Sequence, residues 1–351
     1  MTGRLVPAKP RATMAQTAPK SLKTVILRWI WLPIMALAIV ALLRLVDLDQ
    51  VGQALATANL WNLAAMLGFW LIWLAARPLR MRVLLQATAP ATPVGYNDVY
   101  GAHALGNAIN SLIPMRAGEF AMLWVLARRA RVPIPASLSA VVLDRLCDVA
   151  SALVVLVWAI LVMPNPPQTL VEGVEIFAAL LVVGLVLMAL AVRLRKRALT
   201  LAALLLPRRW HGAVLQRIDD LLQGLGVLAR PAVLVRAVAL SGLIWMLAVL
   251  SFAVGIGAVW PDTTVAMGAF AVGVVAVAFL VPAAPGGIGV FHAAIVFALS
   301  FYGVPTATAL AYALVSHLST FLAGLAAAAI WTLWNGLDPR EIARIPQPPD
   351  A

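Results

Sequence analysis

The sequence predicts an all-α, polytopic integral membrane protein, on composition, on the length of its apolar stretches and on the placement of its charges. Hydrophobic residues make up 63% of the 351 residues and charged residues only 11%, with a mean hydropathy of +0.96. A soluble domain carries roughly a quarter charged residues. A water-soluble fold of this length could not cover its surface with so few charges, so lipid must be the solvent for most of the chain.

Six apolar stretches are long enough to cross a hydrocarbon core of about 30 Å, which takes roughly 20 residues of helix. They cover residues 25–43, 60–76, 136–163, 174–192, 237–260 and 306–334. Two further regions, 97–126 and 264–303, are apolar but interrupted near their centres by Pro and Gly. Each forms either two full spans or a hairpin that enters and returns. The prediction is six full spans plus two broken hairpins, or eight or more spans.

The basic residues orient the predicted spans. With the N-terminus inside, 23 of the 26 Lys and Arg face the cytoplasm, among them Arg77, Arg80 and Arg82 after the second span. Short loops rich in Lys and Arg stay in the cytoplasm. The pattern predicts a multi-pass protein of the bacterial inner (plasma) membrane with both termini cytoplasmic. The net charge of +12 is then explained by topology and anionic lipid, and nucleic acid is not an expected partner because the bases are scattered over several loops.

The predicted organisation is a disordered cytoplasmic tail (1–24), a transmembrane domain (25–334) and a short cytoplasmic tail (335–351). Residues 193–236 form a basic cytoplasmic segment inside the transmembrane domain. Apolar residues recur within it at helical spacing, at Leu215, Ile218, Leu222, Leu225 and Leu228. The spacing predicts an amphipathic helix on the inner leaflet; the alternative is a surface linker with a packed helix.

The two broken regions indicate an inverted repeat. Pro133 precedes Arg145 by the same number of residues as Pro305 precedes His317. In the predicted topology every element of the second half runs opposite to its counterpart in the first. Transporters often follow this plan and place the substrate site where the halves meet.

The first broken region concentrates polar residues within an apolar neighbourhood. Pro114 and Gly118 interrupt the helix there, and freed backbone groups are tolerated at membrane depth only against protein or a wet cavity. The polar residues are Asn107, Asn110, Arg116 and Glu119. We expect Arg116 and Glu119 either to be paired or to face a polar path.

The next span carries three charges. Asp144 and Asp148 are one helical turn apart and share a face, with Arg145 beside them. Each charge at mid-bilayer costs on the order of 2.5–3.5 kcal/mol on insertion scales, so these residues need partners. Arg116 and Glu119 are the expected ones. The cluster is either an ion-pair network that locks helices together or a polar site for an ionic head group.

The second broken region predicts an anion-binding turn. Gly286, Gly287 and Gly289 follow two prolines, and the exposed N–H groups of such a turn can hold a phosphate oxygen. A helix beginning near residue 288 would add its N-terminal dipole. His292 and His317 lie nearby in the predicted topology, as proton relays or as hydrogen-bonded core histidines.

The sequence contains no Walker loop, HExxH motif, nucleophile elbow or Cys/His cluster with metal spacing. It predicts no enzyme activity, no catalytic residue, no cofactor and no metal site. Cys147, the single cysteine, is expected to be a small packing residue.

At these motifs the sequence resembles the lysylphosphatidylglycerol synthase transmembrane region, also called the flippase-like domain family. That pattern has an Asn followed by P-x-R-x-G-E, an acid/Arg pair in the next span, and P-x-x-P-G-G-x-G in the second half. The matching residues are Asn107 or Asn110, Pro114, Arg116, Gly118, Glu119, Asp144, Arg145, Asp148, Pro282, Pro285, Gly286, Gly287 and Gly289. The resemblance covers nearly the whole chain after the N-terminal tail. The pattern usually has a Glu where His292 stands and an Arg where His317 stands.

The resemblance implies lipid translocation, since well-known members move aminoacylated phosphatidylglycerol to the outer leaflet. Those members also carry a soluble aminoacyl-transferring domain, and this chain ends shortly after its last span, so we expect a stand-alone member without lysyl transfer. Expected partners are membrane lipids: an anionic or aminoacylated phospholipid, a hopanoid or a glycolipid.

Three functions follow as hypotheses. The first is a flippase-like transporter of a polar or phosphate-bearing lipid head group. The second is a non-transporting accessory protein of a lipid, hopanoid or glycolipid pathway, which recruits a lipid-modifying enzyme through its basic cytoplasmic segment. The third, a membrane-embedded transferase with Glu119 or Asp148 as base, lacks a recognisable donor site.

Overall fold

The computed structural model describes residues 48–113, 117–205, 207, 211–280 and 285–336, and this part of the chain is helical throughout. Its twelve α-helices are α3 (Leu48–Ala56), α4 (Leu60–Thr88), α5 (Tyr96–Leu112), α6 (Gly118–Arg128), α7 (Ile134–Leu161), α8 (Gln168–Arg193), α9 (Arg195–Leu205), α10 (His211–Leu225), α11 (Pro231–Ile256), α12 (Val265–Ala278), α13 (Val290–Ser300) and α14 (Thr306–Trp334). Two short 3₁₀ helices, η2 (Gly226–Ala229) and η3 (Pro285–Gly287), complete the described chain.

The long helices make this a multi-pass membrane protein. Within the described residues, α4, α8, α11 and α14 are long and apolar enough to cross a membrane. Helix α7 has 28 residues and is as long as these four, but it carries Asp144, Arg145 and Asp148. Five of the six predicted spans therefore coincide with long helices. The sixth, 25–43, lies outside the described residues, as do the predicted tail 1–24 and residues 337–351.

Helix α4 corrects one boundary of the sequence analysis. The span predicted to end at residue 76 continues as helix to Thr88, with Pro78 inside it. Arg77 and Arg80 therefore lie within this helix rather than in a loop, and Arg80 is fully buried. The prediction was wrong because Arg after an apolar stretch usually marks a cytoplasmic boundary, whereas these arginines have partners on α7.

The two broken regions form helix hairpins. Helices α5, α6, α12 and α13 have 17, 11, 14 and 11 residues. At 1.5 Å per residue they span only about 16–26 Å, less than the hydrocarbon core. Arg129, which follows α6, pairs with Asp98 in the first turn of α5 at 3.4 Å, so this hairpin begins and ends on one side. In the second region the ring centroid of Phe270 in α12 lies 5.8 Å from that of Phe301, directly after α13. The second hairpin therefore also begins and ends on one side.

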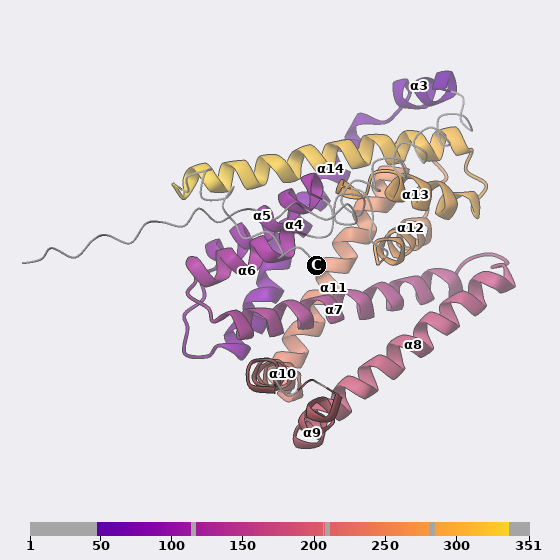
Figure 1. The fold of residues 1–351 in the computed structure, drawn as a ribbon. Helices are drawn as coiled ribbons and strands as arrows, with labels where there is room; N and C mark the ends of the chain where they lie inside the picture. Colours follow the sequence, from indigo (N-terminus) through magenta and orange to yellow (C-terminus); the bar gives the residue numbers. More distant parts are fainter. Residues whose placement is uncertain (1–47, 114–116, 206, 208–210, 281–284, 337–351) are drawn as a thin grey trace, which may run out of the picture.

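The hairpins enter the bundle from opposite ends. Asn97, at the start of α5, donates to Asn335 beyond α14 at 2.7 Å, so the first hairpin opens where α14 ends. Asn62, near the start of α4, donates to the Gly257 carbonyl beyond α11 at 2.9 Å, so α4 and α11 are antiparallel. The second hairpin follows the α11 end and opens on that opposite side. Figure 1 shows α7 and α14 as long helices on either side of this arrangement.

Each hairpin has its own apolar core. One buried cluster surrounds α5 and α6 and includes Met81, Leu105, Val125 and Leu143. The other surrounds α12 and α13 and includes Phe270, Ile295 and Tyr312 among others. The packing crosses over, because α5 packs on α14 and α12 packs on α7. The two hairpins are thereby held in one bundle rather than in separate domains.

Helices α8 to α10 lie at one side of the bundle (Figure 1). No residue of α8 is buried, as expected of a helix that is surrounded by lipid. Helix α10 packs on α7, and a Cβ on Gly224 would collide with the Ser139 side chain. Leu222 and Leu225 are buried at 8% exposure each. Part of the apolar face of residues 215–228 therefore packs against protein, as in the packed-helix alternative, and a position on the leaflet stays a prediction.

Candidate functional site

A buried ion-pair network joins α4 to α7. The Arg80 guanidinium donates to Asp144 at 2.8 Å and to Asp148 at 2.6 Å. It also donates to the Ser241 hydroxyl of α11 at 3.0 Å. The Arg80 and Asp144 side chains are fully buried. Arg80 thereby ties three helices together inside the bundle.

The network becomes more exposed away from Arg80. Arg77 pairs with Asp148 at 3.0 Å, and its side chain is 14% exposed. Arg145 pairs with Glu119 at 3.5 Å and with Asp148 at 3.4 Å. The Arg145 side chain is 37% exposed and that of Glu119 is 23% exposed. Arg145 and Glu119 therefore form the accessible edge of a network whose inner end is closed.

Unsatisfied atoms surround the same network. Within the described part of the chain, five buried polar atoms there have no hydrogen-bond partner: Arg77 Nε, His103 Nε2, Glu119 Oε2, Asp144 Oδ2 and Arg145 Nε. Two of them are donors, two are acceptors and His103 Nε2 can be either. Buried polar groups normally find a partner, so these atoms provide for water or for polar groups of a ligand.

The first hairpin presents Glu119 to α7 at the first turn of α6. Gly118 packs so closely on Gly106 that any Cβ would collide with its carbonyl oxygen. The Gly118 N–H donates to the Asn110 side-chain oxygen at 2.8 Å, so this amide joins α5 to the start of α6. Asn107 contacts α14, because its side-chain nitrogen lies 2.9 Å from where a Gly324 Cβ would be. Arg116 lies outside the described residues.

The second hairpin has the unwound turn that the sequence predicts. Gly286, Gly287 and Gly289 have positive φ of 65°, 71° and 87°, a region open to Gly but costly for other residues. Helix α13 begins at Val290, two residues after the predicted start. The Gly289 N–H donates to His292 Nδ1 at 3.3 Å and is therefore already occupied.

His292 and His317 form a pair beside this turn. Their ring centroids lie 5.0 Å apart, and His317 Nε2 lies 2.9 Å from the Gly286 carbonyl oxygen. Both imidazoles thus bind the turn backbone, which is the arrangement of hydrogen-bonded core histidines. The proton-relay alternative remains a prediction.

The turns of the two hairpins meet inside the bundle. A Cβ on Gly286 would lie 3.1 Å from the Ser111 carbonyl oxygen at the end of α5 and 3.6 Å from the Phe321 ring of α14. The network on one side and the histidine pair on the other therefore flank a junction of two broken helices. Glu119 pairs with one of the three charges of this span, Arg145, as predicted. The other predicted partner, Arg116, lies outside the described residues, and Arg80 and Arg77 bind the two aspartates.

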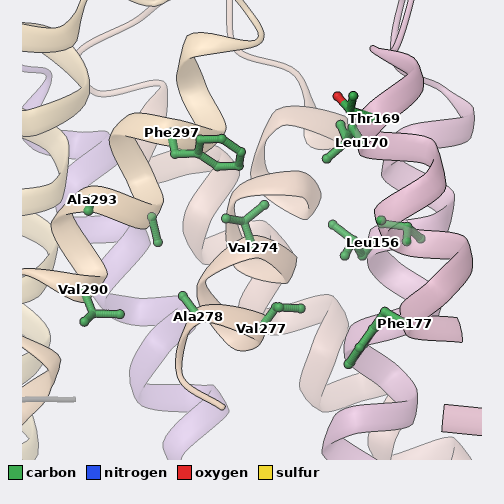
Figure 2. Close-up of a pocket in the computed structure, with 13 residues that line it drawn as sticks. Leu156, Thr169, Leu170, Phe177, Val274, Val277, Ala278, Val290, Ala293 and Phe297 are labelled. Atoms are coloured by element: carbon green, nitrogen blue, oxygen red, sulfur yellow. The ribbon is translucent and has the colours of Figure 1, made fainter. Parts of the chain in front are cut away.

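An apolar groove of about 620 Å³ runs beside the second hairpin, between α7, α8, α12 and α13. Figure 2 shows Leu170 and Phe177 on one side, facing Val274 and Val277 on the other. Its lining extends from Thr169 in the first turn of α8 to Val290, directly after the glycine turn. The groove therefore leads from one end of the bundle to the hairpin junction.

Sequence reasoning missed Arg77, Arg80 and His103 as members of the network. The available signal was spacing, since Arg77 and Arg80 share one helix face as Asp144 and Asp148 share another. Two bases three residues apart on one helix and two acids four residues apart on a neighbouring helix can form two ion pairs between the helices. That signal was masked because the arginines directly follow an apolar stretch.

Two helix hairpins whose broken ends meet beside a buried ion-pair network, inside a set of long apolar helices, define a multi-pass membrane protein with a polar centre. The model of the lysylphosphatidylglycerol synthase TM region matches residues 23–343. The chain belongs to this family. No curated protein and no solved structure shows a significant match to it.

Proposed function

We propose that the protein moves a polar or phosphate-bearing lipid head group between the two leaflets of its membrane, without enzyme activity of its own. The observation that carries the proposal is the accessible edge of the ion-pair network, Arg145 and Glu119, at the base of a broken helix. Arg80 and Asp144 are fully buried, as in a network that only locks helices. Arg145 and Glu119 are instead partly exposed, and each has a buried polar atom without a hydrogen-bond partner among the described residues.

The charges at this edge suit a head group that carries a phosphate. Arg145 would bind phosphate oxygens, and Glu119 would accept hydrogen bonds from the ammonium or hydroxyl groups of the head. Arg116 would add a second base if it faces the same junction. The turn of Gly286 and Gly287 would contact the head group from the other hairpin. The acyl chains would stay in lipid and in the apolar groove beside the second hairpin.

We further propose that the two halves form an inverted repeat, which would suit a transporter. In this repeat α4, α5, α6 and α7 would correspond, in that order, to α11, α12, α13 and α14. The packing is the same in both halves, because α5 packs on α14 and its counterpart α12 packs on α7, the counterpart of α14. The antiparallel α4 and α11 and the opposed hairpins supply the inversion. In such folds a site at the junction is opened to either side by rocking one half against the other. No nucleotide motif is present in the sequence, so a proton, voltage or lipid gradient would drive the movement.

The accessory role is the alternative, with the basic segment as the recruiting surface. Deleting residues 198–230 would not test it cleanly, since Leu222, Leu225 and Val227 are buried in the bundle. Charge reversal at exposed bases of that segment leaves the packing intact and is the better test. Loss of enzyme recruitment with normal lipid movement would favour the accessory role.

The transport proposal is tested with Glu119→Gln and Arg145→Gln in proteoliposomes that contain a head-group-labelled phospholipid. Hydrogen bonds to charged groups contribute about 1.5–3 kcal/mol, so we expect each variant to lower the translocation rate at least about tenfold. Glu172→Gln is the matched control, because Glu172 is exposed in the second turn of α8 and accepts a hydrogen bond from Gln168 of the same helix. Equal rates for Glu119→Gln, Arg145→Gln and the parent would refute the proposed site.

A further inference from the structure

Helix α9 presents a face that packs against nothing in the described protein. Lys196, Arg197, Thr200, Leu201, Leu204 and Leu205 are all exposed and lie on the same side of this helix. The three leucines are 60%, 77% and 85% exposed. The opposite side packs on α10. The exposed face thus combines bases in the first turns with leucines in the last.

The charge on this face has one sign. Residues 193–205 contain Arg193, Arg195, Lys196 and Arg197 and no acidic residue. Of these, Arg195 points to α10 and pairs with Asp219 there. The other three are exposed, and no acid in their own helix neutralises them. An anionic partner is the complement of such a surface.

The position of α9 defines that partner further. A single residue separates the end of α8 from the start of α9. Helix α8 is apolar and has no buried residue. The start of α9 is therefore fixed where a lipid-surrounded helix leaves the membrane. Bases at that level meet lipid phosphates, and leucines one to two turns further on the same face reach the acyl boundary.

We infer that Arg193 at the end of α8, together with the α9 face of Lys196, Arg197, Leu201, Leu204 and Leu205, binds the surface of an anionic leaflet. The bases contact lipid phosphates and the leucines insert between acyl chains. This assigns the leaflet contact to α9, whereas the sequence analysis placed it at residues 215–228, part of whose apolar face packs against α7. The inference does not depend on lipid translocation.

The bound leaflet would be linked mechanically to the ion-pair network. Arg195 and Asp219 join α9 to α10, and Gly224 seats α10 against Ser139 of α7. Asp144 lies farther along the same helix α7. Lipid held at α9 therefore acts on the helix that carries Asp144, Arg145 and Asp148.

The test places an environment-sensitive fluorophore on Leu204→Cys in a Cys147→Ala background of the full chain. The protein is reconstituted in vesicles of phosphatidylcholine alone or with phosphatidylglycerol, with iodide on both sides as an aqueous quencher. Each base near an anionic surface contributes about fivefold to partitioning. We expect phosphatidylglycerol to lower iodide quenching about fivefold or more, and high salt to restore it.

Charge reversal at two places distinguishes an effect of the α9 face from an effect of the protein's net charge. Lys196→Glu with Arg197→Glu should abolish the phosphatidylglycerol effect. Arg217→Glu with Arg236→Glu changes the net charge equally at two other exposed positions and should leave the effect in place. Equal iodide quenching in the two kinds of vesicle would overturn the inference, and it is the result expected if the face binds an acidic protein instead. Equal loss of the phosphatidylglycerol effect in the two double variants would also overturn it.

Discussion

At the scale of single residues, burial divides the ion-pair network into two parts with different roles. Arg80 and Asp144 are fully buried and fix α4 to α7. Arg145 and Glu119 are partly exposed, and Glu119 lies at the start of α6, beside the turn of the first hairpin. Removing one member of a buried pair leaves an uncompensated charge and is costly, whereas an exposed pair contributes little to stability. The inner pair therefore controls stability and the outer pair is free to bind.

This division predicts opposite outcomes for two conservative substitutions. Asp144→Asn should lower the free energy of unfolding by about 3 kcal/mol or more. The reason is that the buried Arg80 guanidinium loses one of the two carboxylates that bind it. Glu119→Gln should lower it by less than about 1 kcal/mol, because its pair with Arg145 is partly exposed and long. Unfolding of each purified variant in detergent measures the difference. Similar losses in both would contradict the division.

The residues of the site were predictable where a charge interrupts an apolar stretch or follows a helix break. Asp144, Arg145 and Asp148 are charges within an apolar stretch, and Glu119 follows a helix break, so each demanded a polar explanation. Arg77 and Arg80 obeyed the rule for loop arginines and were placed outside the span. Only the fold shows that α4 continues past them and faces α7. Which acid binds which base depends on that packing and not on spacing alone.

At the scale of elements, close packing of glycines holds the first hairpin shut. Gly118→Ala should destabilise the protein by about 1–3 kcal/mol, because the new Cβ meets the Gly106 carbonyl oxygen and the backbone must shift. Gly68→Ala in α4 is the control, since no atom lies within 4 Å of its Cβ position. Thermal unfolding of the two variants provides the comparison. A Gly118→Ala protein as stable as Gly68→Ala would show that the hairpin is not so closely packed.

The contact between α9 and α10 depends on one exposed ion pair. The hydrogen bond with Arg195 lowers the pKa of Asp219 below its ordinary value of 3.8. A lowered pKa means that the pair stabilises the contact above the ordinary value, and that this contribution is lost as the pH falls through the lowered pKa. The contact should therefore be unchanged between about pH 5 and 8 and weaken only in strong acid.

Asp219→Asn reproduces that loss at neutral pH. We expect faster amide hydrogen exchange in α9, measured by mass spectrometry, because α9 is held to α10 by this pair. Asp220→Asn is the matched control, since Asp220 accepts its hydrogen bond from Gln216 of the same helix α10. Unchanged exchange in the Asp219 variant would mean that apolar contacts alone hold α9 in place.

Helix breaks were predictable as elements, and their arrangement was not. Pro and Gly near the centres of residues 97–126 and 264–303 announced two interruptions but left hairpins and paired spans equally open. The observed lengths decide for hairpins, because helices of 11 residues cannot cross the core. The meeting of Ser111 with Gly286 is a long-range contact for which neither segment carries a sequence signal.

At the scale of the whole molecule, the two halves are joined differently at their two ends. On the side where the first hairpin opens, Asn335 beyond α14 accepts hydrogen bonds from Asn97 at 2.7 Å and from Arg129 at 3.4 Å. Arg129 also lies over the Trp331 ring at 5.6 Å. At the other end Asn62 of α4 donates to the Gly257 carbonyl beyond α11 at 2.9 Å, and the apolar groove lies between α8 and the second hairpin. The halves are therefore tied at both ends, by side-chain contacts of α5 and α14 at the first and by a contact of α4 with the α11 end at the second.

If lipid movement requires the halves to rock, the tie at Asn97 and Asn335 must open in each cycle. Cysteines at both positions, in a Cys147→Ala background and joined by a short thiol-reactive cross-linker, should stop translocation in proteoliposomes. A cleavable cross-linker should restore it on reduction. Cysteines at Gln168 and Glu172, one turn apart within α8, are the control, because a link inside one helix cannot restrain the halves. Full activity of the cross-linked 97–335 protein would show that the head group crosses without this opening, and the rocking mechanism would then be excluded while the site at Glu119 and Arg145 could still hold.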